Sequence, residues 1–113
     1  MTMKISDVAA VLDGKLVAGA DTGRAVGAVV ANDLMSDVLL VDADDILLLT
    51  SLASDQVIRT ANIIGAMGVV VHNGKPLPEA MCQAAQTFGI PHISSPLPKY
   101  ESCVRIHDFL MRT

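Results

Sequence analysis

The chain has 113 residues and a formal net charge of −4, and 51% of its residues are hydrophobic but only 3% are aromatic. This length fits one domain, whose core must be built from aliphatic side chains and Met, and such a core favours parallel strands covered by helices. Because the basic residues are scattered and lack aromatic companions, the composition argues against nucleic-acid binding.

The sequence also gives an expectation about its compartment. The longest apolar stretch, residues 63–71, is much shorter than the roughly 18 residues that a membrane-spanning helix needs. Acidic residues near the N-terminus interrupt any hydrophobic stretch of a secretion signal. We therefore expect a cytoplasmic protein without a membrane partner. Cys82 and Cys103 would then stay reduced and pack as small apolar side chains.

The first forty residues predict two helices and two strands. In chain order these are a helix over 5–12, strands over 15–19 and 25–32, and a short helix over 33–40 that Asn32 or Asp33 caps. Gly19 to Gly23 reads as the turn between the strands. Gly27 lies inside the second strand, where its missing side chain would let a helix or a second copy of the chain approach closely.

From residue 45 onward, strands and helices alternate. The expected strands cover 45–50, 68–72 and 90–94, and the expected helices cover 55–65, 76–89 and 99–111. Short connections of this kind predict right-handed βαβ crossovers, parallel strands and helices on both faces. The two N-terminal strands could pair in either sense. The predicted fold is therefore a single α/β domain over residues 1–113, with three α/β/α layers around a mostly parallel or mixed sheet.

Polar residues follow four of the predicted strands. In open parallel sheets, ligands bind beyond the carboxyl ends of the strands, where helix N-termini favour an anion or a ribose hydroxyl. The alternative is that these residues serve only as helix caps and turns. The candidate ligand-binding residues are Asn32, Asp33, Ser36, Asp37, Thr50, Ser51, His72, Asn73, Gly74, Ser94 and Ser95.

The spacings typical of catalytic and cofactor motifs do not occur. Glycines 19, 23 and 27 are four apart and match neither common phosphate-loop pattern, and the histidines lack zinc-site spacing. His92 falls inside a strand and is expected to pack with one hydrogen bond. A small enzyme would need Asp33 and Asp37, placed on one helix face, to converge with His72. We assign no catalytic or metal-binding residue, and any cofactor is unknown.

Several segments together resemble a DRTGG domain, over about residues 4–112. They are LDGKLVAGA, VGAVVANDLMSDVL, DILLLTS and GVVVHNGKPLPEAMCQAAQTFGIPHISSPLPKYES, and the most specific pieces are NDLMSDVL and NGKPLPE with FGIPHISSP. The literal Asp-Arg-Thr-Gly-Gly string is absent, and His72-Asn73-Gly74 stands where the family often has Thr-Gly-Gly. The resemblance implies a fold similar to the N-terminal domain of HPr kinase.

The resemblance also implies a non-catalytic module that often pairs as a dimer. Such domains occur beside CBS domains in regulated inorganic pyrophosphatases, within long forms of phosphate acetyltransferase, and as separate proteins encoded near iron-only hydrogenases. The expected function is a regulatory or ligand-sensing homodimer, with a nucleotide or small anion as ligand. The alternative is a protein-interaction adaptor for a hydrogenase or redox assembly, without a small-molecule site.

Overall fold

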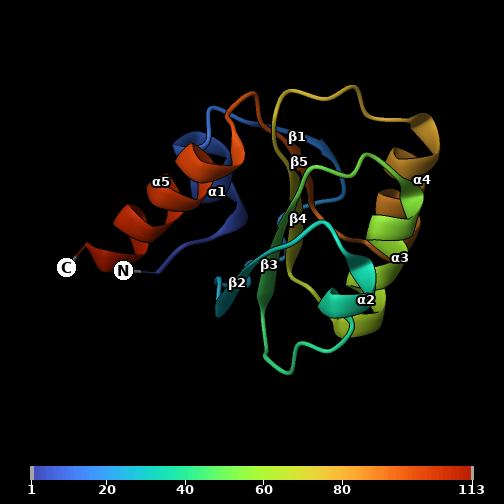
Figure 1. Ribbon diagram of the computed structural model, residues 1–113, viewed down its shortest axis with the longest axis horizontal. Coiled ribbons are helices and arrows are strands. Elements are labelled where there is room, and N and C mark those ends of the chain that lie inside the picture. Colours follow the sequence, from blue (N-terminus) through green and yellow to red (C-terminus); the bar gives the residue numbers. More distant parts are fainter. Residues whose placement is uncertain (1, 113) are drawn as a thin grey trace.

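The computed structural model describes residues 2–112 and has three layers, with the sheet between two groups of helices (Figure 1). In chain order the elements are α1 (Ile5–Val11), β1 (Lys15–Ala18), β2 (Ala28–Ala31), α2 (Met35–Val38), β3 (Ile46–Thr50), α3 (Asp55–Ile64), β4 (Gly68–Val71), α4 (Glu79–Phe88), β5 (His92–Ser94) and α5 (Lys99–Met111). The predicted three-layer α/β class is confirmed.

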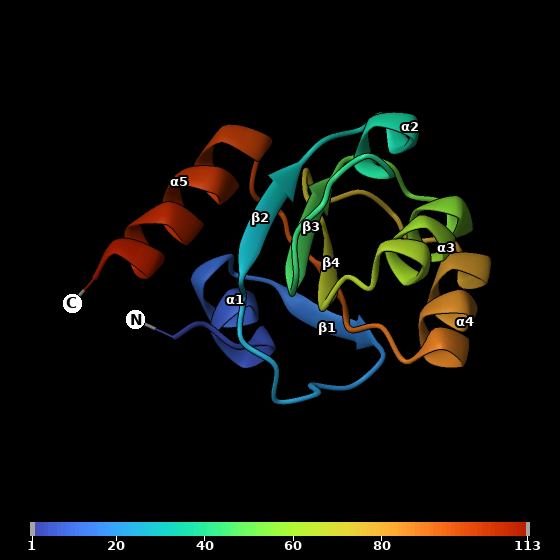
Figure 2. The same ribbon diagram turned by 90° about the horizontal axis from the view of Figure 1, so that it is seen from below.

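The sheet has the strand order β1-β5-β4-β3-β2. Strands β2 to β5 are parallel, and β1 runs antiparallel to β5, so the sheet is mixed. Strands β1 and β2 therefore lie at opposite edges. The segment from Gly19 to Gly27 is not a hairpin turn, because it carries the chain from one edge of the sheet to the other (Figure 2).

The two faces of the sheet bury separate apolar clusters. Helices α1 and α5 cover one face, and α2, α3 and α4 cover the other (Figures 1 and 2). Side chains alternate along β3, so that Ile46 and Leu48 pack toward α2, α3 and α4 while Leu47 and Leu49 pack toward α1 and α5. Because both faces are covered, the central strands β3 and β4 are buried at every position, as their aliphatic runs predict.

The ends of the helices agree with the sequence signals in most places. The Ser54 hydroxyl accepts a hydrogen bond from the Gln56 amide at the start of α3, as predicted. Gly65 and Gly89 end α3 and α4 in the left-handed conformation that glycine adopts without strain. Cys82 on α4 and Cys103 on α5 are free thiols and half-buried. None of the described helices is both long and apolar enough to cross a membrane.

Two local predictions are wrong. The short helix α2 begins only at Met35 with Leu34 as its N-cap, because the Asn32 side chain closes a turn by accepting a hydrogen bond from the Leu34 amide. Gly27 lies just before β2 rather than inside it. A Cβ there would approach the Asp44 carbonyl oxygen at 2.7 Å, so the close neighbour within the chain is the loop before β3 and not a helix.

Candidate functional site

The candidate residues gather where the parallel strands end. Because β2, β3, β4 and β5 run in the same direction, their carboxyl ends lie at one edge of the sheet, and β3, β4 and β5 end toward the top of Figure 1. The loops that follow lead into α2, α3, α4 and α5. The sequence prediction that these polar segments share an edge is therefore confirmed as a matter of placement.

Asp33 links the ends of β2 and β3. Its Oδ1 accepts a hydrogen bond from the Thr50 hydroxyl at 3.0 Å and one from the Ser51 amide at 2.7 Å. The Ser51 amide lowers the pKa of Asp33 most, the hydroxyls and nearby Lys99 lower it further, and partial burial opposes them. Since Asp33 precedes α2, it does not share a helix face with Asp37, and that prediction is wrong.

Several other candidates act as structural links within the edge. The buried Ser95 hydroxyl donates to the Leu12 carbonyl at 2.7 Å and accepts from the Leu97 amide at 3.2 Å. The Thr50 hydroxyl also accepts from the Leu52 amide at 3.2 Å. The side chains of Ser95, Thr50 and Asn32 therefore stabilise turns and connections within the chain, which is the structural alternative to ligand binding.

A left-handed turn joins the loops after β4 and β5. Asn73 and Gly74 both have positive φ angles, of 72° and 62°. The Asn73 amide donates to the Leu97 carbonyl at 2.8 Å, and the Gly74 amide donates to the Ser95 carbonyl at 2.9 Å. Asn and Gly are the residue types that adopt this conformation most readily, so the sequence suits the turn. The turn fixes the loop after β4 against the loop after β5.

His72 is the most unusual residue of the edge. It is only 1% exposed, and neither ring nitrogen has a hydrogen-bond partner. Burial lowers the pKa of its imidazole; the neighbouring Asn73 side chain and the charge of Asp33 oppose this, and the charges of Lys99 and Lys75 reinforce it. The ring therefore lies within electrostatic reach of charged groups from three different loops. It forms no hydrogen bond with Asp33.

The remaining candidates are exposed or half-buried, and their side chains form no hydrogen bond within the described part of the chain. Ser36 and Asp37 are exposed on α2, and Ser94 is half-buried at the end of β5. The sequence analysis missed Lys75 and Lys99, which act on His72 from the loop after β4 and the first turn of α5. Their positions in the sequence could have indicated this role, because each lysine follows a predicted strand within a few residues.

A second buried histidine lies away from this edge. His92 on β5 pairs with Ala18 of β1 and Val69 of β4, is completely buried, and has no hydrogen-bond partner on either ring nitrogen. Packing inside the strand was predicted, but the expected hydrogen bond is absent. Burial alone lowers the pKa of His92 to about 4. It is therefore a neutral core residue at physiological pH.

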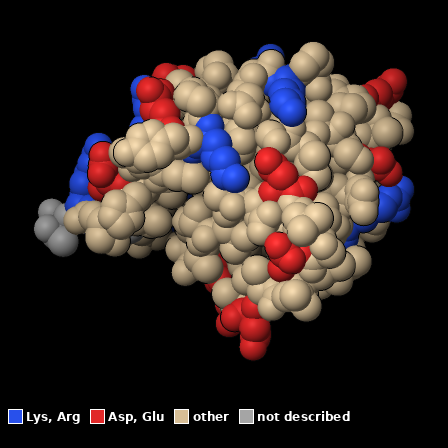
Figure 3. Space-filling model, viewed as in Figure 1, with Lys and Arg blue, Asp and Glu red and all other residues tan. Residues whose placement is uncertain are grey.

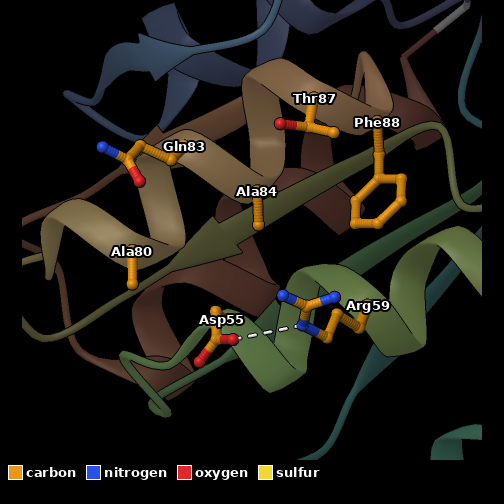
Figure 4. A pocket seen from close by; sticks show the side chains of 7 residues that line it. All are labelled: Asp55, Arg59, Ala80, Gln83, Ala84, Thr87 and Phe88. Carbon is orange, nitrogen blue, oxygen red and sulfur yellow. Dashed lines mark hydrogen bonds and ion pairs between the residues drawn. The ribbon is translucent and has the colours of Figure 1, made fainter.

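Several surface hollows lie apart from the strand ends. One, of about 240 Å³, runs between α3 and α4, where the Arg59 guanidinium contacts Asp55 at 3.1 Å and approaches the Phe88 ring (Figure 4). Another, of about 310 Å³, lies between β2 and α5 and is lined by Val29, Ala31, Cys103, Ile106, His107 and Leu110. On the face shown in Figure 3, basic and acidic side chains are interspersed without an extended patch of one charge.

Neither a metal centre nor a relative identifies the site. Across residues 2–112, no group of three or more His, Cys, Asp or Glu side chains is placed to hold a metal ion. No protein-family model matches the sequence, and no curated protein matches it. The function is therefore argued from the geometry of the strand ends.

Proposed function

We propose that this chain is a non-catalytic, ligand-sensing regulatory domain of the DRTGG type, which binds a nucleotide or another small anion at the carboxyl edge of its sheet. The observation that carries the proposal is His72, a buried imidazole without a hydrogen-bond partner at the point where three loops meet. Leaving a buried polar group unpaired costs roughly 1–3 kcal/mol. Such a cost calls for an explanation, and a ligand site at this edge supplies one.

The contacts of the edge suit a sensing role. Asp33 holds the ends of β2 and β3 together through Thr50 and Ser51, immediately before α2. Lys99, the first residue of α5, acts electrostatically on Asp33. An anionic ligand that attracts Lys99 would weaken that interaction. Ligand binding would thereby change the forces on α2 and α5, which lie on opposite faces of the sheet.

A ligand screen with a matched pair of variants tests this function. We expect a nucleotide or small anion to raise the melting temperature, by roughly 10 °C at a concentration one hundred times its dissociation constant. Asp33→Asn should strengthen that response, because it removes a negative charge that repels the anion and competes with it for Lys99. The amide oxygen of Asn can still accept the hydrogen bonds from Thr50 and Ser51. Asp42→Asn, in the exposed loop after α2, is the control and should respond like the wild type. The proposal fails if no compound raises the melting temperature, or if Asp33→Asn leaves the response unchanged or weakens it.

The homodimer would form through the open edge of β2. This edge strand, Ala28–Ala31, contains no charge and no proline, the features that usually protect an exposed edge from pairing. Val29→Lys should convert the dimer to a monomer in sedimentation at micromolar concentration. Val17→Lys is the matched control, since Val17 lies on the other edge strand and is 38% exposed compared with 37% for Val29. A monomeric wild type would rule out the dimer.

The adaptor alternative has its own supporting observation. Leu34, Leu39 and Leu40 flank the single turn of α2 and are exposed, Leu40 by 81%. A protein partner that covers these side chains would explain their exposure. In that case, Leu40→Ser would abolish capture of a specific partner from the native host, while the ligand screen would find nothing. Capture that is unaffected by Leu40→Ser would count against the adaptor.

A further inference from the structure

Three exposed charged side chains act on the buried His72 imidazole from loops at the same edge of the sheet, and backbone hydrogen bonds join the loop after β4 to the loop before α5. The three side chains are Asp33 after β2, Lys75 after β4 and Lys99 at the start of α5, and each acts on the ring electrostatically. Asp33 is already engaged by Thr50 and Ser51. Within the described part of the chain, neither lysine forms a hydrogen bond or an ion pair through its side chain. Of the three charged groups that act on the ring, the two ammonium groups are therefore the ones that remain available to bind a ligand.

We infer that Lys75 and Lys99 together bind a small oxyanion, either a free inorganic anion or a phosphate group of a larger ligand, and that His72 takes up a proton from solvent when the anion binds. This inference rests on the proposed ligand-sensing function and specifies the class of ligand and the coupled event. One proton passes from hydronium in the solvent to an imidazole nitrogen, so one O–H bond breaks as one N–H bond forms, and no other covalent bond changes.

Electrostatics explains the coupling. In the free protein, removal from water and the two ammonium groups all disfavour the imidazolium, and only Asp33 and the Asn73 side chain favour it. A bound dianion would neutralise the lysines and attract the imidazolium directly. The balance around His72 would then shift toward the protonated ring, because Asp33 would no longer be opposed.

The surrounding backbone gives the proton a way to act on the fold. The His72 amide donates to the Thr50 carbonyl at 3.1 Å, and the Asn73 amide donates to the Leu97 carbonyl at 2.8 Å. The backbone at His72 is therefore bonded to β3 and to the loop before α5. An imidazolium has two N–H donors, and neither ring nitrogen has a partner in this structure. Protonation would favour the approach of acceptors to the ring and would thereby shift these segments.

Nuclear magnetic resonance of the full chain measures the proton directly. The chain has three histidines, so their ring C–H signals can be followed separately between pH 5 and 8. The probe is sodium sulfate, compared with sodium chloride at equal ionic strength, because sulfate stays dianionic over this range. We expect saturating sulfate to raise the midpoint of His72 by about one pH unit. His107, exposed on α5, is the internal control and should not move.

Variants locate the anion. The double variant Lys75→Gln/Lys99→Gln should lose the response of His72 to sulfate, whereas Lys15→Gln, an exposed lysine on β1, should keep it. His72→Gln should still bind sulfate in calorimetry but without proton uptake. An unmoved His72 midpoint in the wild type overturns the inference even if His72→Gln does not fold. A response that persists in the double variant, or an equal shift of His107, also overturns it.

A comparison of sulfate, a nucleoside monophosphate and the parent nucleoside tests this inference separately from the proposed function. If sulfate alone moves His72, the inference holds with a free oxyanion as ligand. If a nucleoside monophosphate also moves His72, the inference holds with a phosphate group as the recognised part. If the parent nucleoside raises the melting temperature without moving His72, the inference is wrong and the ligand-sensing function stands. If none of the three binds, the inference is wrong, and the wider screen of nucleotides and small anions decides the ligand-sensing function.

Discussion

Mild acid should destabilise this protein, and His92 is the main reason. The imidazole is completely buried between β1 and β4 and has no hydrogen-bond partner. Burial lowers its pKa from the ordinary 6.5 to about 4. The folded protein therefore keeps His92 neutral over a pH range in which the unfolded chain binds a proton.

The sign and the size of the effect follow from this difference. Stability from a lowered histidine pKa is fully present above pH 6.5 and is lost as the pH falls toward 4, because only the unfolded state binds the proton in that range. The gap between 6.5 and about 4 corresponds to a loss of about 3 kcal/mol. At pH 5.0 the same relation gives a loss of about 2 kcal/mol. The lowered pKa of His72 adds to it with the same sign.

Urea unfolding at pH 7.5 and 5.0 measures this loss. Circular dichroism is the suitable signal, since the chain has no Trp and a single Tyr. His92→Leu should reduce the difference between the two pH values by about 2 kcal/mol, because an apolar side chain of similar size cannot bind the proton. His107→Gln, which changes an exposed histidine, should leave the difference unchanged.

Two outcomes would refute this reasoning. One is a wild-type free energy of unfolding that is equal at pH 7.5 and 5.0. The other is a His92→Leu variant that keeps the full pH dependence of the wild type. Either result would mean that His92 finds a hydrogen-bond partner or solvent in the folded state, so that its proton affinity is ordinary.

Four further substitutions test the backbone and the side-chain bonds that join its segments. Gly19→Ala should lower the free energy of unfolding by more than about 2 kcal/mol, because Gly19 has a φ of 75° and an added Cβ would collide with the Ile90 carbonyl. Gly23→Ala is the comparison. Gly23 has a similar φ but open space around it, so this change should lower the free energy of unfolding by only about 1 kcal/mol. Ser95→Ala should cost about 1–3 kcal/mol in urea unfolding, because it removes a buried hydroxyl with two hydrogen bonds. Arg24→Ala should cost less than 1 kcal/mol, because its ion pair with Asp45 is exposed.

The sequence predicts the central part of this fold well because that part depends on local patterns. The aliphatic runs of β3 and β4 indicate strands buried on both faces, and α5 covers the predicted residues 99–111. The edge strands are different. Strands β1 and β2 follow each other in the chain but lie at opposite edges of the sheet, and only contacts with β5 and β3 decide this. Short strands without a strong local pattern leave such long-range pairing open.

The candidate site, like the fold, could be predicted only in part from the sequence. The order of strands and helices was sufficient to predict that the polar segments share one edge. It was not sufficient to predict which polar groups are already paired. Asp33 is committed to Thr50 and Ser51, which lie 17 and 18 positions further along the chain. Lys99 acts on His72 from 27 positions away, because β4 and β5 are neighbours. Contacts at such distances have no signature in a single sequence.

The two buried histidines separate stability from ligand coupling. Both lack hydrogen-bond partners, and burial is the largest influence on each. For His92 it is the only influence, since the ring lies within the sheet with no charged group acting on it. The proton affinity of His72 also depends on the charges of Asp33, Lys75 and Lys99. An anion at the strand ends can therefore change the proton affinity of His72 and has no comparable way to reach His92. Between pH 5 and 8, sulfate should move the midpoint of His72 and leave the ring signals of His92 unchanged, so a change in both would point to a general change in the fold.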